Sequence, residues 1–130
     1  MYRYPQEAFP YDNLVAENKK RTRTDEEYDL IDTGIFDNNK FFDISVEYAK
    51  NAEEDILIRI HVLNKYHENK ELVVLPTAWF RNTWSWDNHA QKPSAYLVTN
   101  NEIRFSHHDH GTYNLYFDQH PELLFCENET

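Results

Sequence analysis

The sequence has little glycine, little cysteine and no long apolar run, and each shortage excludes a class of protein. Two of its 130 residues are glycine, whereas average usage gives about nine. Neither of the glycine-rich phosphate loops, GxGxxG or GxxxxGKS/T, can be built from two glycines. The single cysteine, Cys126, cannot form an internal disulfide, so nothing favours secretion. Because no apolar stretch approaches the ~20 residues that cross a bilayer, we expect a soluble cytoplasmic protein.

The charge balance is acidic, with 23 Asp and Glu against 13 Lys and Arg and a formal net charge of −10. This excess repels phosphate backbones and anionic lipid surfaces, so we expect neither nucleic acid nor a membrane as a partner. Aromatic residues make up 15% of the chain and hydrophobic residues 40%. That content is too apolar for a disordered protein, and it indicates a folded, aromatic-rich chain.

The chain divides by pattern into residues 1–29 and residues 30–130. The first part begins as an extended segment, because Pro5 and Pro10 forbid a continuous helix. A short helix is then expected over residues 12–21, with Asp12 as its N-cap. The second part alternates with a period of two, which is typical of strands. We expect strands at residues 42–49, 56–63, 72–75, 95–99, 103–107, 113–118 and 123–126.

The strand pattern predicts an all-β fold, an antiparallel β-sandwich with a short N-terminal helix. The segment at 56–63 carries apolar residues on both faces, which indicates a central strand. Asn100-Asn101 and Gly111 lie where neighbouring strands would reverse direction. Strands separated by such turn signals are typical of antiparallel sheets and sandwiches.

The densest chemical feature is the segment WFRNTWSW at residues 79–86, with three tryptophans in eight positions. Indole rings can stack on the apolar face of a sugar while amide and guanidinium groups bind its hydroxyls. If the segment is extended, its last two tryptophans point to one face, as they would in a core or a domain interface. The candidates for a carbohydrate contact or a domain interface are Trp79, Arg81, Asn82, Trp84 and Trp86.

A second cluster, His107-His108-Asp109-His110, has the residue types of a metal site. In a regular strand these residues alternate between two faces, so three ligands converge only at a bulge or turn. We therefore interpret the cluster as a polar hairpin end, with His107, His108 and His110 as weak metal candidates, and expect no metal or cofactor. Among 23 carboxylates the sequence selects no pair for acid–base chemistry, so no catalytic residue is assigned.

Several segments occur in an order that resembles a known family: YPQEAFPY at 4–11 and LVAEN at 14–18, LIDTGIFD at 30–37, FFDI at 41–44 and VEYAK at 46–50, DILIRI at 55–60, LPT at 75–77 and WFRNTWSW at 79–86, and PELLF at 121–125 and ENET at 127–130. Together they resemble large microbial proteins similar to glycoside hydrolase family 63, the mannosyl-oligosaccharide glucosidase family.

This resemblance implies that the chain is part of a larger enzyme. Members of the family join an N-terminal β-sandwich, a supersandwich, to an (α/α)6-barrel that hydrolyses α-glucosidic or related bonds with inversion. The present chain resembles part of the sandwich. The two catalytic carboxylates of the family lie in the barrel, so none is carried over to this sequence. The resemblance thus implies a parent glycosidase of which this chain is an inactive part.

Two further expectations follow from the resemblance. The chain looks like a piece excised from a longer protein, with its natural partner, the barrel, missing. Uncovered strand edges and aromatic side chains favour self-association, so we expect a homo-oligomer.

The alternative function is an independent carbohydrate-binding module that binds an oligosaccharide through the tryptophans of residues 79–86.

Overall fold

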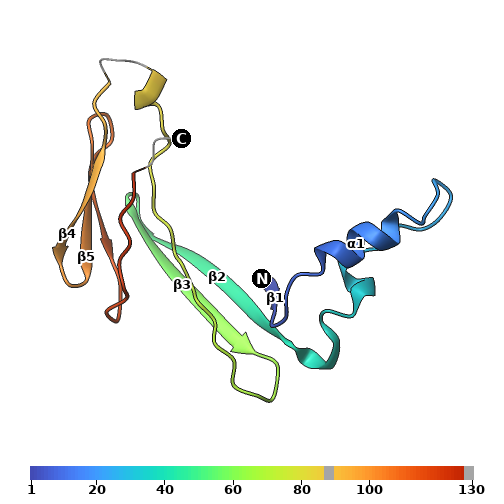
Figure 1. The fold of residues 1–130 in the computed structure, drawn as a ribbon. Helices are drawn as coiled ribbons and strands as arrows, with labels where there is room; N and C mark the ends of the chain where they lie inside the picture. Colours follow the sequence, from blue (N-terminus) through green and yellow to red (C-terminus); the bar gives the residue numbers. More distant parts are fainter. Residues whose placement is uncertain (87–89, 128–130) are drawn as a thin grey trace. The chain divides into compact units, whose positions relative to one another are not determined.

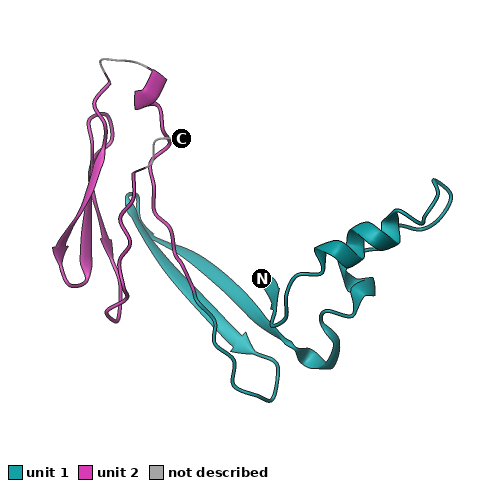
Figure 2. Ribbon diagram, viewed as in Figure 1, with its two compact units in different colours: residues 1–73 teal, residues 74–130 magenta. Residues whose placement is uncertain are grey.

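A computed structural model of the chain describes residues 1–86 and 90–127. The chain forms two compact units, Met1–Val73 and Val74–Thr130 (Figure 2). Each unit contains one three-stranded antiparallel sheet, which confirms the all-β class. A face-to-face sandwich of the two sheets stays a prediction. No helix among the described residues is long and apolar enough to span a bilayer. The last segment of the resemblance, at 127–130, ends in residues 128–130, which lie outside the described residues.

The first unit is a long hairpin with a short strand along one edge (Figure 1). Its regular elements are β1 (Tyr2–Pro5), α1 (Tyr11–Asn18), two 3-10 turns (Leu30–Thr33 and Asp37–Asn39), β2 (Phe41–Ala52) and β3 (Asp55–Asn64). The strand order is β1-β2-β3, so the central position predicted for residues 56–63 is wrong: β2 is central and β3 is an edge strand. Apolar residues on both faces of β3 therefore do not mark it as the central strand of the described sheet.

Strand β1 was not predicted from the sequence, because four residues with a proline carry too short a pattern. It pairs antiparallel with β2 in the register Tyr2 opposite Ile44 and Pro5 opposite Phe41. Proline is tolerated there because β1 is an edge strand. The pairing places the start of the predicted 1–29 segment in the same sheet as residues of the predicted 30–130 segment.

The predicted helix is confirmed, with different ends. It begins at Tyr11 after Pro10, so Asp12 lies in its first turn and is not the N-cap. It ends at Asn18, whose side chain amide donates to the carbonyl oxygens of Leu14 and Tyr28 at 3.1 and 2.8 Å. The Asn18 side chain also accepts the backbone N–H of Tyr28 at 3.0 Å. These bonds satisfy backbone groups at the helix end and tie it to the following loop.

The two faces of the β2–β3 hairpin differ in chemistry. Residues directly opposite one another share a face, and the pairs Ile44–Val62, Val46–Ile60 and Tyr48–Ile58 form one apolar face. The other face is mixed: Glu47 lies 3.9 Å from Arg59 and 3.4 Å from His61, and the exposed Leu57 and Leu63 lie on this face too. The apolar face is largely exposed, and the Ile58 side chain is 56% accessible to solvent. We call this surface, formed by those three pairs and Ile56, the hairpin apolar face.

The core of the first unit is small and lies at the end of the hairpin beside the 3-10 turns. Ile35, Phe41 and Phe42 are buried there, and Phe42 is 4% exposed. The Phe36 ring meets the Phe41 ring edge-on at 5.9 Å. The Arg3 guanidinium lies 4.0 Å from the centre of the Phe41 ring, which is a cation–π contact. Burial in this unit is therefore concentrated at one end of the sheet.

The second unit contains a three-stranded meander. Its strands are β4 (Ser94–Thr99), β5 (Glu102–His107) and β6 (Gly111–Tyr116), and β5 lies in the centre. A two-residue connection joins β4 to β5, and a three-residue connection joins β5 to β6. The turns expected at Asn100-Asn101 and Gly111 are confirmed, and Gly111 has a φ of +76°, where a side chain would be strained. The strands expected at 72–75 and 123–126 are absent from these described residues, since no other segment pairs with them.

The second sheet also has one apolar and one polar face. Ala95, Phe105 and Tyr113 lie side by side, as do Leu97, Ile103 and Leu115, and both rows belong to the same face. The polar face carries Arg104, whose guanidinium donates to Asn114 at 3.0 Å and to Glu102 at 3.3 Å. Ile103 is 9% exposed, so the centre of the apolar row is covered.

Candidate functional site

The tryptophan segment is anchored on the second sheet by Phe80. The Phe80 ring meets the Phe105 ring edge-on at 5.8 Å and the His107 ring at 5.3 Å. Both partners belong to β5 and share its apolar face. Phe80 therefore covers part of this face and holds the chain on either side of it against the same unit.

The tryptophan segment is not extended at its end, so the condition under which the last two tryptophans would share one face is not met. Trp84, Ser85 and Trp86 form a 3-10 turn, closed by a hydrogen bond from the Trp86 N–H to the Thr83 carbonyl oxygen at 3.2 Å. In a 3-10 turn residues i and i+2 point in different directions. The Trp84 indole nitrogen is buried with no hydrogen-bond partner among the described residues, whereas Trp86 is 71% exposed. The two rings do not form one flat platform.

The remaining candidates of this segment have separate roles. Trp79 is 69% exposed and offers an open indole face. The Arg81 guanidinium lies 5.6 Å from the centre of the Trp86 ring, so it already occupies one face of that indole. The Asn82 side-chain oxygen accepts the Ser85 N–H at 3.3 Å and thereby caps the turn. The structure thus brings Arg81 and Trp86 together, while Asn82 has a local structural task.

The histidine cluster lies at the hairpin turn between β5 and β6, which confirms the expected hairpin end. His107 is the last residue of β5 and pairs with Gly111, so the three residues between them form the connection. In contrast to a regular strand, this turn gathers one ligand atom each of His107, His108 and Asp109 within 4.8 Å. Of the weak candidates, His107 and His108 belong to this group, and the His110 ring lies 4.5 Å from the His107 ring.

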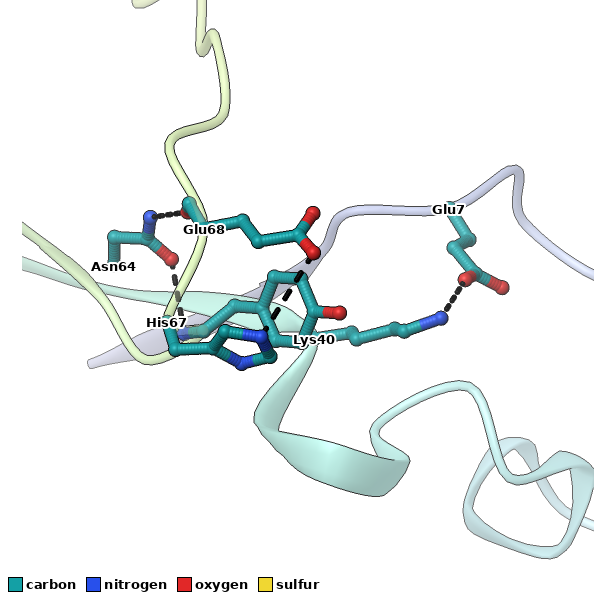
Figure 3. Close-up of polar contacts among 6 residues, drawn as sticks. Glu7, Lys40, Asn64, His67 and Glu68 are labelled. Atoms are coloured by element: carbon teal, nitrogen blue, oxygen red, sulfur yellow. Dashed lines mark hydrogen bonds and ion pairs between the residues drawn. The ribbon is translucent and has the colours of Figure 1, made fainter.

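A polar depression in the first unit was not predicted. It is lined by Gln6, Glu7, Lys40, Tyr66, Glu68 and Lys70. The Gln6 amide donates to the Asn64 side-chain oxygen at 2.7 Å, and the Asn64 amide donates to the Glu68 carbonyl oxygen at 2.8 Å (Figure 3). Because these partners are up to 58 positions apart, no local sequence pattern indicated the depression.

An ion pair at the rim of this depression shifts two pKa values. Lys40 donates to a carboxylate oxygen of Glu7 at 2.7 Å (Figure 3). This hydrogen bond, together with the charge of Lys40, holds the pKa of Glu7 below its usual range. The same contact raises the pKa of Lys40. Both side chains are exposed to solvent, so the pair is typical of a surface contact of small energy.

Asp25 also has a lowered pKa, for a different reason. Its carboxylate accepts the Thr22 backbone N–H at 2.7 Å and the Thr22 hydroxyl at 2.8 Å. The backbone bond is the larger cause of the lowered pKa of Asp25. A general acid in glycoside hydrolysis needs the opposite shift, a carboxyl group with a raised pKa. Neither Glu7 nor Asp25 has that property.

Comparison with known proteins gives one relative and no established family. The chain is 30% identical over 135 residues to a Saccharomyces cerevisiae protein with the name uncharacterized protein YMR196W. The alignment takes in 93% of this chain and 12% of the yeast protein. The chain therefore spans about an eighth of the length of the curated relative it matches. No family model matches the chain, and no solved structure matches it.

Proposed function

We propose that this chain is a non-catalytic β-sheet portion of a larger glucosidase similar to glycoside hydrolase family 63. In this proposal an (α/α)6-barrel elsewhere in the parent protein hydrolyses α-glucosidic or related bonds with inversion. The part described here packs against that barrel and supplies no catalytic group. The observation that carries the proposal is the hairpin apolar face, which no described residue of its own unit covers to the degree expected of a core.

The chemistry of this face suits a permanent protein interface. Its cross-strand pairs are aliphatic or aromatic along most of the hairpin, while the opposite face carries Arg3–Asp43 and Arg59–Glu47 ion pairs. A contiguous exposed apolar surface is uncommon on soluble monomers and marks interaction sites. Obligate interfaces resemble a domain core cut in half. The exposed row of apolar pairs on this face therefore supports a sheet that is completed by further protein.

The length of the yeast relative also supports a modular role. It is about eight times longer than the aligned region, so it has room for a barrel domain besides this sheet-forming part. The ordered segments that resemble the glucosidase family supply the reaction class. The lowered pKa values of Glu7 and Asp25 make neither carboxyl group suited to the role of the catalytic acid.

A paired glycosidase assay tests the proposal. The 130-residue chain and the longest parent protein that contains it are purified and assayed on glucose disaccharides with different α-linkages. We expect turnover by the long form alone. Turnover by the short chain would contradict the non-catalytic assignment, and a parent that is inactive on all of these α-glucosides would contradict the glucosidase assignment.

Self-association is part of the same proposal. In the absence of the barrel, the hairpin apolar face of one chain is free to pack on that of another. We expect light scattering to give a homo-oligomer at micromolar concentration. A strictly monomeric profile across that range would contradict this expectation.

A cytoplasmic location is proposed as well, and fractionation of cells that express the full parent protein tests it.

An independent carbohydrate-binding module is the second candidate, favoured by the exposure of Trp79 and Trp86. Aromatic rings open to solvent can stack on a sugar. Titration of tryptophan fluorescence with glucose, kojibiose, nigerose and mannosylglycerate tests it, with Trp79→Phe and Trp86→Phe as variants. A saturable shift that either variant removes would support this module, and an unchanged spectrum at millimolar sugar would exclude it.

A further inference from the structure

We propose that the β5–β6 turn of the second unit binds one divalent transition-metal ion through His107, His108 and Asp109. The three side chains offer ligand atoms that all lie within 4.8 Å of one another. This inference is independent of the glucosidase proposal, because it concerns a hairpin turn and needs no catalytic domain.

The backbone creates this convergence. Strand β5 ends at His107 and β6 begins at Gly111, so the intervening residues turn through half a circle instead of alternating between two faces. The positive φ of Gly111, +76°, permits the tight return of the chain. Neighbouring residues that would point to opposite sides of a strand therefore point to a common side. The His107 and His108 rings are nearly parallel, with an angle of 16° and 4.8 Å between their centres.

One pair of these atoms already has a separation close to that of two metal ligands. The His108 Nε2 and Asp109 Oδ2 atoms lie 3.0 Å apart, and two ligands of a tetrahedral zinc ion with bonds of about 2.0–2.1 Å lie roughly 3.3 Å apart. The Asp109 N–H donates to His107 Nδ1 at 3.1 Å, which marks this nitrogen as the unprotonated one in the neutral ring. A metal ion would take the place of that N–H as the partner of the lone pair.

The surroundings allow the remaining adjustment. The His108 and Asp109 side chains are 40% and 67% exposed, so small rotations meet little resistance and the solvent-exposed contact between them is weak. His107 is held more firmly, because its ring packs against Phe80 at 5.3 Å. One packed ligand and two exposed ones can close around an ion. The His110 ring, 4.5 Å from His107, is available as a fourth ligand, or water completes the site.

The donor set defines the class of ion. Imidazole nitrogens with one carboxylate suit zinc, cobalt, nickel and copper, whereas magnesium and calcium prefer oxygen ligands alone. The net charge of −10 lowers the cost of bringing any cation to the chain, but it does not select this turn. Selection rests on the paired imidazoles.

The test uses the tag-free 130-residue chain, with zinc titration by calorimetry and cobalt binding by visible absorption. The matched control is His67→Gln. His67 is an exposed histidine that lies 3.8 Å from the Glu68 carboxylate, but it is not part of the β5–β6 turn. We expect one ion per chain, absorption bands of tetrahedral cobalt, and an affinity that His108→Gln or Asp109→Asn lowers on the order of tenfold or more. His67→Gln should leave the affinity unchanged.

Circular dichroism shows whether each variant keeps its sheets, so loss of fold is distinguished from loss of a ligand. Any of three results would overturn the proposal: no binding of zinc or cobalt at millimolar concentration, a stoichiometry other than one ion per chain, or equal effects of His108→Gln and His67→Gln. Magnesium and calcium serve as negative controls, and binding of either with similar affinity would also contradict the assigned donor set.

Discussion

In each sheet the strands follow one another in sequence order, yet among the described residues only the second sheet has the middle of its apolar face covered. In the second sheet Phe80 packs on Phe105, and Ile103 is 9% exposed. In the first sheet Tyr48 and Ile58 lie opposite each other and are both largely exposed. Alternation thus decides which side chains share a face, while burial depends on whether a separate segment lies across that face.

The largest expected effect comes from the few buried positions. Phe42→Ala removes a ring from the core of the first unit and should lower the free energy of unfolding by about 3–5 kcal/mol. Ile103→Ala in the second sheet should cost about 2–5 kcal/mol. Urea unfolding followed by circular dichroism measures both, and tryptophan fluorescence reports on the second unit, which holds all three tryptophans. Leu57→Ala, at a position that is 58% exposed on the opposite face of β3, is the control with an expected change within about 0.5 kcal/mol, and an equal cost at Leu57 would show that exposure does not rank these positions.

The next effect concerns association through the first sheet. Ile58→Lys should weaken self-association by roughly 1.5–3 kcal/mol, the burial energy of one large aliphatic side chain. Leu57→Lys is a closely matched control, because Leu57 is 58% exposed on the same strand but lies on the opposite face. Light scattering across micromolar concentrations measures the oligomer. Equal effects of the two substitutions would mean that association does not use the hairpin apolar face.

A smaller effect is expected where the second sheet is covered. Phe80→Ala removes the ring contacts to Phe105 and His107, and such aromatic contacts contribute about 0.5–1.5 kcal/mol each beyond the buried area. The fluorescence-detected unfolding midpoint should fall, and the emission of the native protein should shift to longer wavelength as the tryptophan segment is released. Phe125→Ala, at a ring that is 53% exposed, should change neither quantity. An unchanged midpoint in Phe80→Ala would remove the structural basis of the comparison.

The smallest effect is electrostatic and lies in the first unit. Because the folded pKa of Glu7 is lowered from its ordinary value of 4.5, the Lys40 contact stabilises the fold above that value and the stabilisation is lost as the pH falls through the lowered pKa. The raised pKa of Lys40 adds a loss only at pH values above its ordinary 10.5. Carboxyl-carbon NMR titration should show that Lys40→Gln raises the pKa of Glu7 and leaves that of Asp25 unchanged. Thr22→Ala removes the hydroxyl donor and keeps the backbone N–H, so it should raise the pKa of Asp25 and leave that of Glu7 unchanged. A Glu7 pKa that does not respond to Lys40→Gln would contradict the contact.

Much of the secondary structure could be predicted from local pattern. The period of two in Ile56, Ile58 and Ile60 indicated β3. Asn100-Asn101 and Gly111 indicated the turns of the second sheet. The predictions failed where pairing decides the outcome. Strand β1 depends on a partner 42 positions away, Tyr2 opposite Ile44. The apolar residues at 72–75 form no strand, because no segment within 1–86 and 90–127 pairs with them.

The candidate sites divide in the same way. The residue types of the tryptophan segment and the histidine cluster are visible in the sequence, because they are consecutive. Their geometry is not, since a 3-10 turn separates Trp84 from Trp86 in direction and a hairpin turn brings His108 and Asp109 to within 3.0 Å. The polar depression around Lys40 and Glu7 had no sequence signal at all, because its parts come from three distant segments.

The sequence by itself determined the antiparallel β class, the positions of the tight turns and the composition of each strand face. These properties depend on backbone dihedral preferences and on a period of two, which act over a few residues. The tertiary structure alone decided which strand is central, which apolar face is covered and which side chains meet. Those outcomes depend on segments tens of residues apart, and the entropy of bringing them together is offset only by contacts that a local pattern does not contain.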